Sequence, residues 1–337
     1  MAELESDVPP TMPSARARAL QATAPPDAGG RLAVPAPFHL EATVRVLQRR
    51  PANRVDVWED GRYLRVLGSA GGLALVEVAD AGSVDEPGLR FRVLHGDPAA
   101  PGRAELGTML RRMLGLDLDP EPLQQRAESE PRLRETALAL RGMRPPRFAG
   151  LFEAFASVVP FQQLSLDAGI AVLGRLVERF GRSLEHAGQR RFAFPAAAAV
   201  AEARIAALTA CGLSHKKAET LRQVARSIGS GELGEEPLSR MSSREAIRCL
   251  DELPGVGPWT AALVLLRGLG RLDVFPPGDV GVARGLGGLL GLRSPRSLER
   301  VVARFGDQRG YLYFCSLGAA LLARDLVHAA PPPGRSA

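Results

Sequence analysis

Hydrophobic and polar residues alternate with a period of two in the first part of the chain. Every second residue from Phe38 to Val46 is apolar, and the alternation returns at residues 89–93. Two short, mostly apolar runs at residues 63–67 and 73–78 each follow turn residues. A period of two indicates half-buried β-strands. An Asp-Gly pair at residues 60–61 suits a tight hairpin turn. The pattern predicts an antiparallel sheet of roughly four or five strands.

Helical periodicity replaces the alternation in the rest of the chain. Residues 104–115 predict a helix that covers one face of the sheet, and beyond about residue 120 we expect helices only. Ser165 and Ser214 stand where helix N-caps belong, and Gly181 stands where a C-cap belongs. The fold class is therefore α+β, with an N-terminal antiparallel sheet, its covering helix and an all-α core.

Four segments follow from these patterns. Residues 1–35 are rich in Ala and Pro and predict a disordered tail, as do residues 331–337. Residues 36–120 predict the sheet domain, and residues 121–330 predict the helical core.

A helical hairpin is the most informative local motif. A helix over residues 244–253 must stop at Pro254, and the next helix begins at Pro258, a residue favoured at a first helical position. The glycines of the intervening turn allow positive φ and a close approach of a ligand. The amides of the turn suit a DNA phosphate. The turn's carbonyls could hold a monovalent cation, Na⁺ or K⁺, and we assign those of Leu253, Gly255 and Val256 to it.

A single carboxylate follows this hairpin. After a Gly-rich bend and Pro276-Pro277-Gly278, a new helix begins with Asp279 near its first turn. An Asp at this position is most often a helix cap. Here the chain runs back toward the phosphate-binding turn before it reaches Asp279. We therefore expect the Asp279 carboxylate to lie beside the path of a DNA backbone.

Composition supports an anionic partner and excludes several kinds of site. Lys and Arg number 43 against 37 for Asp and Glu, a net charge of +6, which favours nucleic acid modestly. The three cysteines and five histidines show no metal-ligand spacing, so we expect no transition metal and no redox or nucleotide cofactor. The chain shows neither an apolar run of membrane length nor a secretory signal pattern, so we expect a cytoplasmic protein without a membrane partner.

Four motifs in order resemble one protein family. They are Phe-Gln-Gln-Leu-Ser at 161–165, Cys-Gly-Leu-Ser-His-Lys-Lys-Ala-Glu-Thr-Leu at 211–221, Leu-Pro-Gly-Val-Gly-Pro-Trp-Thr-Ala at 253–261 and Asp-Val-Phe-Pro-Pro-Gly-Asp at 273–279. Together they resemble the helix–hairpin–helix DNA glycosylases, most closely the bacterial 3-methyladenine DNA glycosylase II group. The resemblance covers about residues 150–320, and the preceding sheet is similar to that group's N-terminal domain. It implies a glycosylase core, double-stranded DNA as partner, a place at the bacterial nucleoid and a monomer.

The resemblance also implies roles for individual residues. Asp279 matches the catalytic aspartate, and Gln162 and Gln163 match the loop whose side chain wedges into the duplex. Trp259 takes the position at which bifunctional lyases carry a Schiff-base lysine, so no strand cleavage is expected. The matches to the DNA-binding hairpin are Pro254, Gly255, Val256, Gly257, Trp259 and Thr260.

One carboxylate suits the implied chemistry. A base alkylated at a ring nitrogen is cationic and leaves without protonation, so only the oxocarbenium-like sugar and the attacking water need help. Asp279 can stabilise the first and orient the second. The sequence therefore predicts a monofunctional N-glycosylase that flips out alkylated bases of the 3-methyladenine or 7-methylguanine type.

The base pocket and the phosphate contacts are less well defined by the sequence. Leu263 and Gln308 stand where the resembled group frequently has aromatic rings. The pocket candidates are Phe161, Trp259, Leu263, Phe275 and Gln308. Tyr311 and Tyr313 fit the core better. The phosphate-contact candidates are Lys216, Lys217, Arg267, Arg284 and Arg309.

Two other functions stay open at this point. A glycosylase for deaminated, oxidised or bulkier lesions would need extra donors in its pocket. A non-catalytic helix–hairpin–helix protein would bind DNA without needing Asp279.

Overall fold

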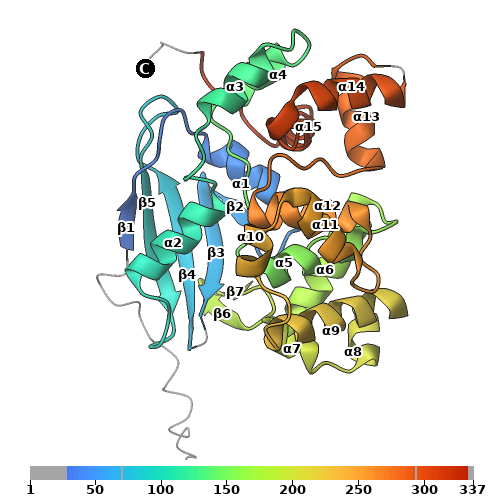
Figure 1. The fold of residues 1–337 in the computed structure, drawn as a ribbon. Helices are drawn as coiled ribbons and strands as arrows, with labels where there is room; N and C mark the ends of the chain where they lie inside the picture. The colour runs from blue at the N-terminus through green and yellow to red at the C-terminus, as the bar shows by residue number, and fades with distance from the viewer. Residues whose placement is uncertain (1–28, 70, 293, 333–337) are drawn as a thin grey trace, which may run out of the picture.

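The computed structural model describes residues 29–69, 71–292 and 294–332, and a sheet lies on one side of a helical core (Figure 1). The sheet is antiparallel with the order β1-β5-β4-β3-β2. Its strands are β1 Gly29–Leu32, β2 Val57–Glu59, β3 Arg62–Gly68, β4 Leu73–Asp80 and β5 Leu89–Gly96. The predicted α+β fold class is confirmed.

The helix predicted to cover the sheet is present as α2, Arg103–Met113, and lies against one face (Figure 1). Its apolar side, Leu106, Leu110 and Met113, is fully buried in the same core as the sheet residues. The Asp-Gly turn also forms as expected, because Asp60 and Gly61 both have positive φ between β2 and β3.

The strand predicted at residues 38–46 is wrong, because this segment forms helix α1, Leu40–Gln48. Leu40, Val44 and Leu47 pack into the core that contains the sheet, whereas Ala42 and Val46 pack into the C-terminal core. Because α1 is buried on two sides, its apolar residues do not form a single helical stripe and stand at every second position from 40 to 46. Alternation over so short a segment does not distinguish such a helix from a strand.

The N-terminal tail predicted over residues 1–35 is also wrong in part. Gly29–Leu32 forms the edge strand β1, paired with β5. The carbonyl of Pro35 accepts a hydrogen bond from the buried Arg144 side chain. Residues 1–28, and 333–337 of the other predicted tail, lie outside the described residues. The predicted boundary near residue 120 stays a prediction.

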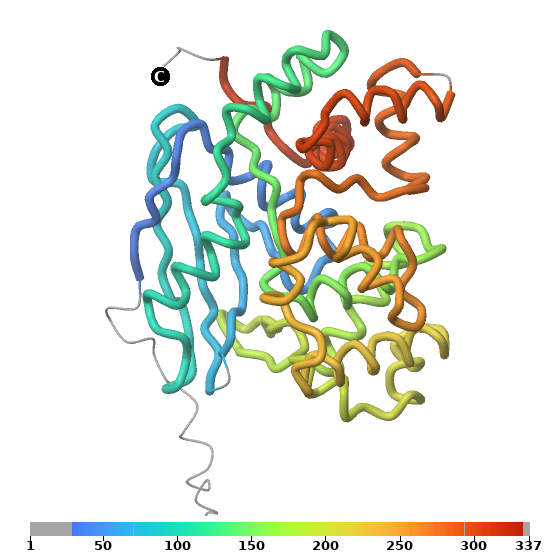
Figure 2. Tube along the Cα trace, viewed as in Figure 1, coloured from blue at the N-terminus to red at the C-terminus, as the bar shows by residue number. Residues whose placement is uncertain are grey.

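The helical core packs short helices around the buried α5 and α12. Residues 140–150 pass between it and the sheet (Figure 2). The helices are α3 Glu121–Glu128, α4 Arg134–Ala139, α5 Leu151–Ala156, α6 Leu166–Phe180, α7 Ala197–Ala201, α8 Ile205–Thr209, α9 His215–Gly229, α10 Glu235–Arg240, α11 Ser243–Asp251, α12 Pro258–Val264, α13 Val280–Leu289, α14 Pro295–Arg304 and α15 Tyr311–Leu322. Ser165 and Ser214 cap α6 and α9 as predicted, and Gly181 is the C-cap of α6. No helix of the described residues combines the length and the apolar character that a membrane span requires.

The prediction of helices only beyond residue 120 needs one correction. Strands β6, Ser183–His186, and β7, Gln189–Phe192, form a hairpin beside the sheet. Ala193 makes an isolated bridge to Val66 of β3. Both strands are short and carry charged residues, so the sequence pattern does not predict them.

A buried ion cluster joins the sheet to the helical core. Arg65 of β3 donates to Asp56 at 2.5 Å and to Glu153 of α5 at 2.6 Å. Tyr63 donates to the same Asp56 at 2.7 Å. The three charged side chains are 2 to 7% exposed, so solvent screens the cluster little.

Candidate functional site

The predicted hairpin is formed by α11, a tight turn and α12. Ser242 and Glu245 form a reciprocal capping box that starts α11, and Pro258 starts α12 as expected. Gly255 has φ +81°, and a Cβ at this position would lie 2.0 Å from Oγ1 of Thr220 on α9. Only glycine fits here, so the shape of the turn is fixed by its packing on α9.

Asp279 is the N-cap of α13, half-buried, and both of its carboxylate oxygens are held. Oδ1 accepts a hydrogen bond from the amide of Val282 at 2.9 Å, as a capping residue does. Oδ2 accepts one from Nε1 of Trp259, on the first turn of α12, at 3.0 Å. The carboxylate is therefore fixed from two helices, one of which belongs to the hairpin.

Asp279 and Trp259 line a cleft of about 690 Å³, here called the hairpin cleft. Its walls are the loop 161–164, the first turn of α9, the hairpin turn and residues 278–281. Residues of the hairpin turn, the Asp279 carboxylate and the loop thus line one open space.

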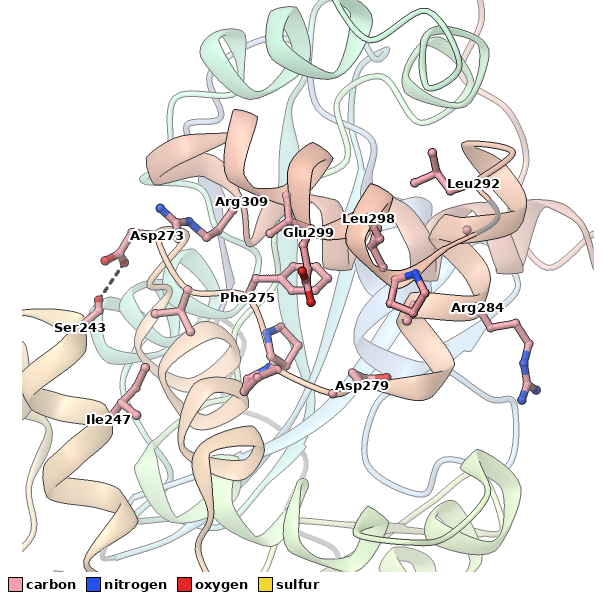
Figure 3. A pocket seen from close by; sticks show the side chains of 18 of the residues that line it. Ser243, Ile247, Asp273, Phe275, Asp279, Arg284, Leu292, Leu298, Glu299 and Arg309 are labelled. Atoms are coloured by element: carbon pink, nitrogen blue, oxygen red, sulfur yellow. Dashed lines mark hydrogen bonds between the residues drawn. The ribbon is translucent and has the colours of Figure 1, made fainter.

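A second cleft, of about 1110 Å³, lies on the other side of the segment 273–279 (Figure 3). This outer cleft is bounded by α11, α13 and α14, and it shares Gly278 and Asp279 with the hairpin cleft. Ser243 donates to Asp273 at 2.8 Å, which ties the start of the shared segment to α11. The outer cleft lacks Trp259 and the hairpin turn.

The five pocket candidates do not meet in one place. Trp259 and Phe161 line the hairpin cleft, and Phe275 lines the outer cleft. Leu263 is 4% exposed and packs in the C-terminal core, and Gln308 is half-buried; neither lines either cleft. As pocket walls, Leu263 and Gln308 are wrong predictions. Tyr311 and Tyr313 are buried in the core, as expected.

Phe161 anchors its loop more than it shapes the cleft. A Cβ at Gly169 would lie 2.2 Å from its ring, so α6 packs directly against it. The Arg49 guanidinium lies 4.2 Å from the ring centroid, a cation–π contact. With neighbours this close, little of the ring is free to stack on a base.

The two predicted wedge residues differ in their surroundings. The Gln162 amide donates to the carbonyl of Gly255 at 3.0 Å and to Oγ1 of Thr260 at 2.9 Å, so it is bound to the hairpin. Gln163 is exposed, with φ +56°. Its neighbour Leu164, which the sequence did not single out, is 43% exposed at the edge of the cleft.

The residues predicted to contact phosphates lie in different environments. Arg267 is wrong, because it is 1% exposed and its guanidinium lies 4.5 Å from the ring centroid of Phe148. Lys216 is exposed on the hairpin cleft, whereas Lys217 binds two backbone carbonyls of the loop. Arg284 and Arg309 border the outer cleft, with the Arg284 side chain directed away from it (Figure 3).

Two of the three carbonyls in the predicted cation site accept a hydrogen bond within the protein. The Gly255 carbonyl accepts from Gln162, and the Leu253 carbonyl accepts from the amide of Val256 at 3.0 Å. A carbonyl oxygen has two lone pairs, so each of these carbonyls keeps one for a cation. A Na⁺ or K⁺ ion held by the carbonyls of Leu253, Gly255 and Val256 stays a prediction.

Both parts of the chain match known protein families. Residues 156–305 match the HhH-GPD superfamily of base excision DNA repair proteins, and residues 30–149 match the AlkA N-terminal domain. The chain belongs to the helix–hairpin–helix DNA glycosylase superfamily. The resemblance seen in the sequence motifs is thus confirmed.

Individual members of the superfamily align over most of the chain. The DNA-3-methyladenine glycosylase of Bacillus subtilis is 33% identical over 53% of this chain and 59% of its own length. The DNA-3-methyladenine glycosylase 2 of Escherichia coli is 27% identical over 67% of this chain and 76% of its own length. The 3-methyladenine DNA-glycosylase of Archaeoglobus fulgidus superposes with a TM-score of 0.71 at 27% identity, covering 87% of this chain and 99% of that one. The chain spans only 55 to 59% of the length of two of the curated relatives it matches.

Proposed function

We propose that the chain is a monofunctional DNA N-glycosylase that removes alkylated bases of the 3-methyladenine or 7-methylguanine type. It would act as a monomer on double-stranded DNA, in the cytoplasm at the nucleoid. The observation that carries the proposal is the position of the Asp279 carboxylate, which is held by Trp259 and Val282 at the edge of the hairpin cleft. The named relatives support the choice of lesion, since they are 3-methyladenine glycosylases.

The residues divide the reaction among themselves. The hairpin amides and Lys216 would hold the backbone phosphates, while the loop at Gln163 and Leu164 would fill the space that the base leaves. The bond between the sugar C1′ and the base nitrogen breaks, and its electron pair neutralises the cationic base. Asp279 stabilises the positive charge that develops on the sugar. Water then bonds to C1′ and gives its proton to Asp279 or solvent.

Strand cleavage is not part of the proposed reaction. A lyase needs an amine that attacks C1′, and Trp259 offers none at the position that the resemblance assigns to it. The ammonium of Lys217 is engaged by two carbonyls.

Base release from randomly methylated duplex DNA tests the proposal. We expect the intact protein to free 3-methyladenine or 7-methylguanine without strand breaks, and Asp279→Asn to free neither. Release from duplexes with a deaminated or oxidised base, but not from methylated DNA, would assign a different lesion. DNA binding without any release would instead favour the non-catalytic function.

A further inference from the structure

Lys217 makes a contact that a phosphate-binding lysine does not need. It lies in the first turn of α9, and its ammonium donates to the carbonyls of Pro160 at 3.1 Å and Gln162 at 2.6 Å. Burial lowers the pKa of this ammonium. Two of its three donors are thus used inside the protein, and freeing them for DNA would leave two carbonyls without these partners.

The same segment is bound a second time, from the hairpin. Gln162 donates to Gly255 and Thr260, while Thr220, one turn after Lys217 on α9, donates to the carbonyl of Pro254 at 3.0 Å. The loop, α9 and the hairpin are therefore joined by side-chain donors to backbone carbonyls. A shift of one would move the others.

This network fixes the two exposed residues that follow it. Gln163 holds φ +56°, a conformation that costs a non-glycine residue about 1 kcal/mol or more. Leu164 keeps an apolar side chain in solvent at the cleft edge. Both residues directly follow the bonds at Pro160 and Gln162, which hold the segment that carries them.

The two lysines in the first turn of α9 are adjacent and differently placed. Lys216 and Lys217 are the only two lysines among the 43 Lys and Arg residues of the chain. Lys216 is exposed, and the structure shows no ion pair for it among the described residues.

We propose that Lys217 is a positioning residue for base flipping, which holds residues 160–164 against the hairpin and contacts no phosphate. Lys216 alone of this pair binds the DNA backbone. This inference rests on the proposed glycosylase function, because flipping is its first step. It gives the two neighbouring lysines opposite behaviour in two measurements, and a third measurement tests flipping itself.

Amine acetylation, followed by mass spectrometry, needs no variant. In the free protein we expect Lys216 to be acetylated readily and Lys217 slowly, and duplex DNA to protect Lys216. The inference is wrong if Lys217 reacts as fast as Lys216 in the free protein and DNA protects it equally.

The salt dependence of DNA binding gives a second comparison. The binding constant K falls as salt concentration rises. Loss of one phosphate contact makes the slope of log K against log salt concentration less steep by about 0.9. Using a duplex with a tetrahydrofuran abasic site, we expect this loss for Lys216→Gln and no change of slope for Lys217→Gln. An equal loss in both variants would make Lys217 a phosphate contact.

Flipping and release complete the test. At saturating DNA we expect Lys217→Gln to reduce base release, and the fluorescence rise of 2-aminopurine beside the lesion, by about tenfold, the effect of losing a charged hydrogen bond. Gln162→Met should reproduce this loss, and the double variant should lose no more than either one, since both break one link. Wild-type flipping and release in both single variants would overturn the inference.

Failure of the proposed function has a different signature. If the wild-type protein releases no base, the glycosylase proposal fails. Acetylation, salt slope and 2-aminopurine fluorescence still decide the role of Lys217 on the tetrahydrofuran duplex. If Lys217→Gln does not fold, acetylation of the wild-type protein and the Gln162→Met variant remain decisive.

Discussion

Nε1 of Trp259 lies 3.0 Å from Oδ2 of Asp279 and donates a hydrogen bond to it. Because Trp259 belongs to the first turn of α12, this bond connects the proposed DNA-binding hairpin to the carboxylate. A duplex bound to the hairpin would thus be aligned with the proposed catalytic group by a single side chain.

Trp259→Phe keeps an aromatic ring and removes the donor. We expect single-turnover base release to fall about tenfold, the typical effect of losing one hydrogen bond to a charged group. Affinity for a tetrahydrofuran duplex should change little. Trp58 on β2 is the chain's other tryptophan, so Trp58→Phe is the matched control and should release base at the wild-type rate. Equal rates in both variants would mean that the bond to Asp279 is not used.

Asp279 caps α13 and has a proposed chemical role, and two substitutions separate the two. Asn caps helices as well as Asp does, so Asp279→Asn should keep the free energy of unfolding within a few tenths of a kcal/mol. Asp279→Ala should lower it by about 1 kcal/mol. Urea unfolding measures this difference, while both variants should release no base. Residual release by Asp279→Asn alone would show that the cap, and not the charge, is what the reaction needs.

Leu164 and Leu138 are two exposed leucines in different places. They are 43% and 38% exposed, so replacing either with Ala should change the unfolding free energy by less than about 0.5 kcal/mol. Leu164→Ala should nevertheless reduce base release about tenfold, because it removes apolar surface that would be buried in the duplex. Leu138→Ala, on α4, should not. The idea fails if the two variants have the same release rate.

His39 makes stability depend on pH. Its Nδ1 accepts from the amide of Ala42 at 3.3 Å and caps α1, and its Nε2 lies 3.0 Å from the carbonyl of His328, so the bonds fit the neutral ring. Burial lowers the pKa of His39. The unfolded chain therefore takes up a proton first as the pH falls below about 6.5, and the free energy of unfolding decreases there.

Urea unfolding between pH 8 and pH 5 checks this dependence. The wild-type protein should lose stability more steeply on acidification than His39→Asn, which keeps a cap that does not titrate in this range. His186→Asn, in the β6–β7 turn region, should follow the wild-type curve. Parallel curves for all three proteins would assign the acid sensitivity to other groups.

The sequence predicted what depends on local chemistry. The turn at Gly255, the helix start at Pro258 and the capping Asp279 each follow from the backbone preference of one residue type. The wrong predictions concern residues whose structure depends on their tertiary environment. α1 appeared as a strand because it is buried on two sides, and Arg267 appeared as a phosphate ligand although a cation–π contact holds it in the interior. Residue type alone does not separate Lys216 from Lys217, since only the fold brings a carbonyl pair to one of them.

The buried cluster of Arg65, Asp56 and Glu153 bears on how this protein can be divided or recombined. Cutting the chain near residue 149 would remove Arg65 and leave the Glu153 carboxylate without its cation. The same cut would expose apolar side chains of the core that the sheet and α5 share, at about 25 cal/mol per Å² of surface, against a typical domain stability of about 5–15 kcal/mol. We therefore expect that the helical part does not fold as an independent domain. A minimal enzyme, a gene fusion or a chimera with another family member would have to carry the sheet along with the hairpin.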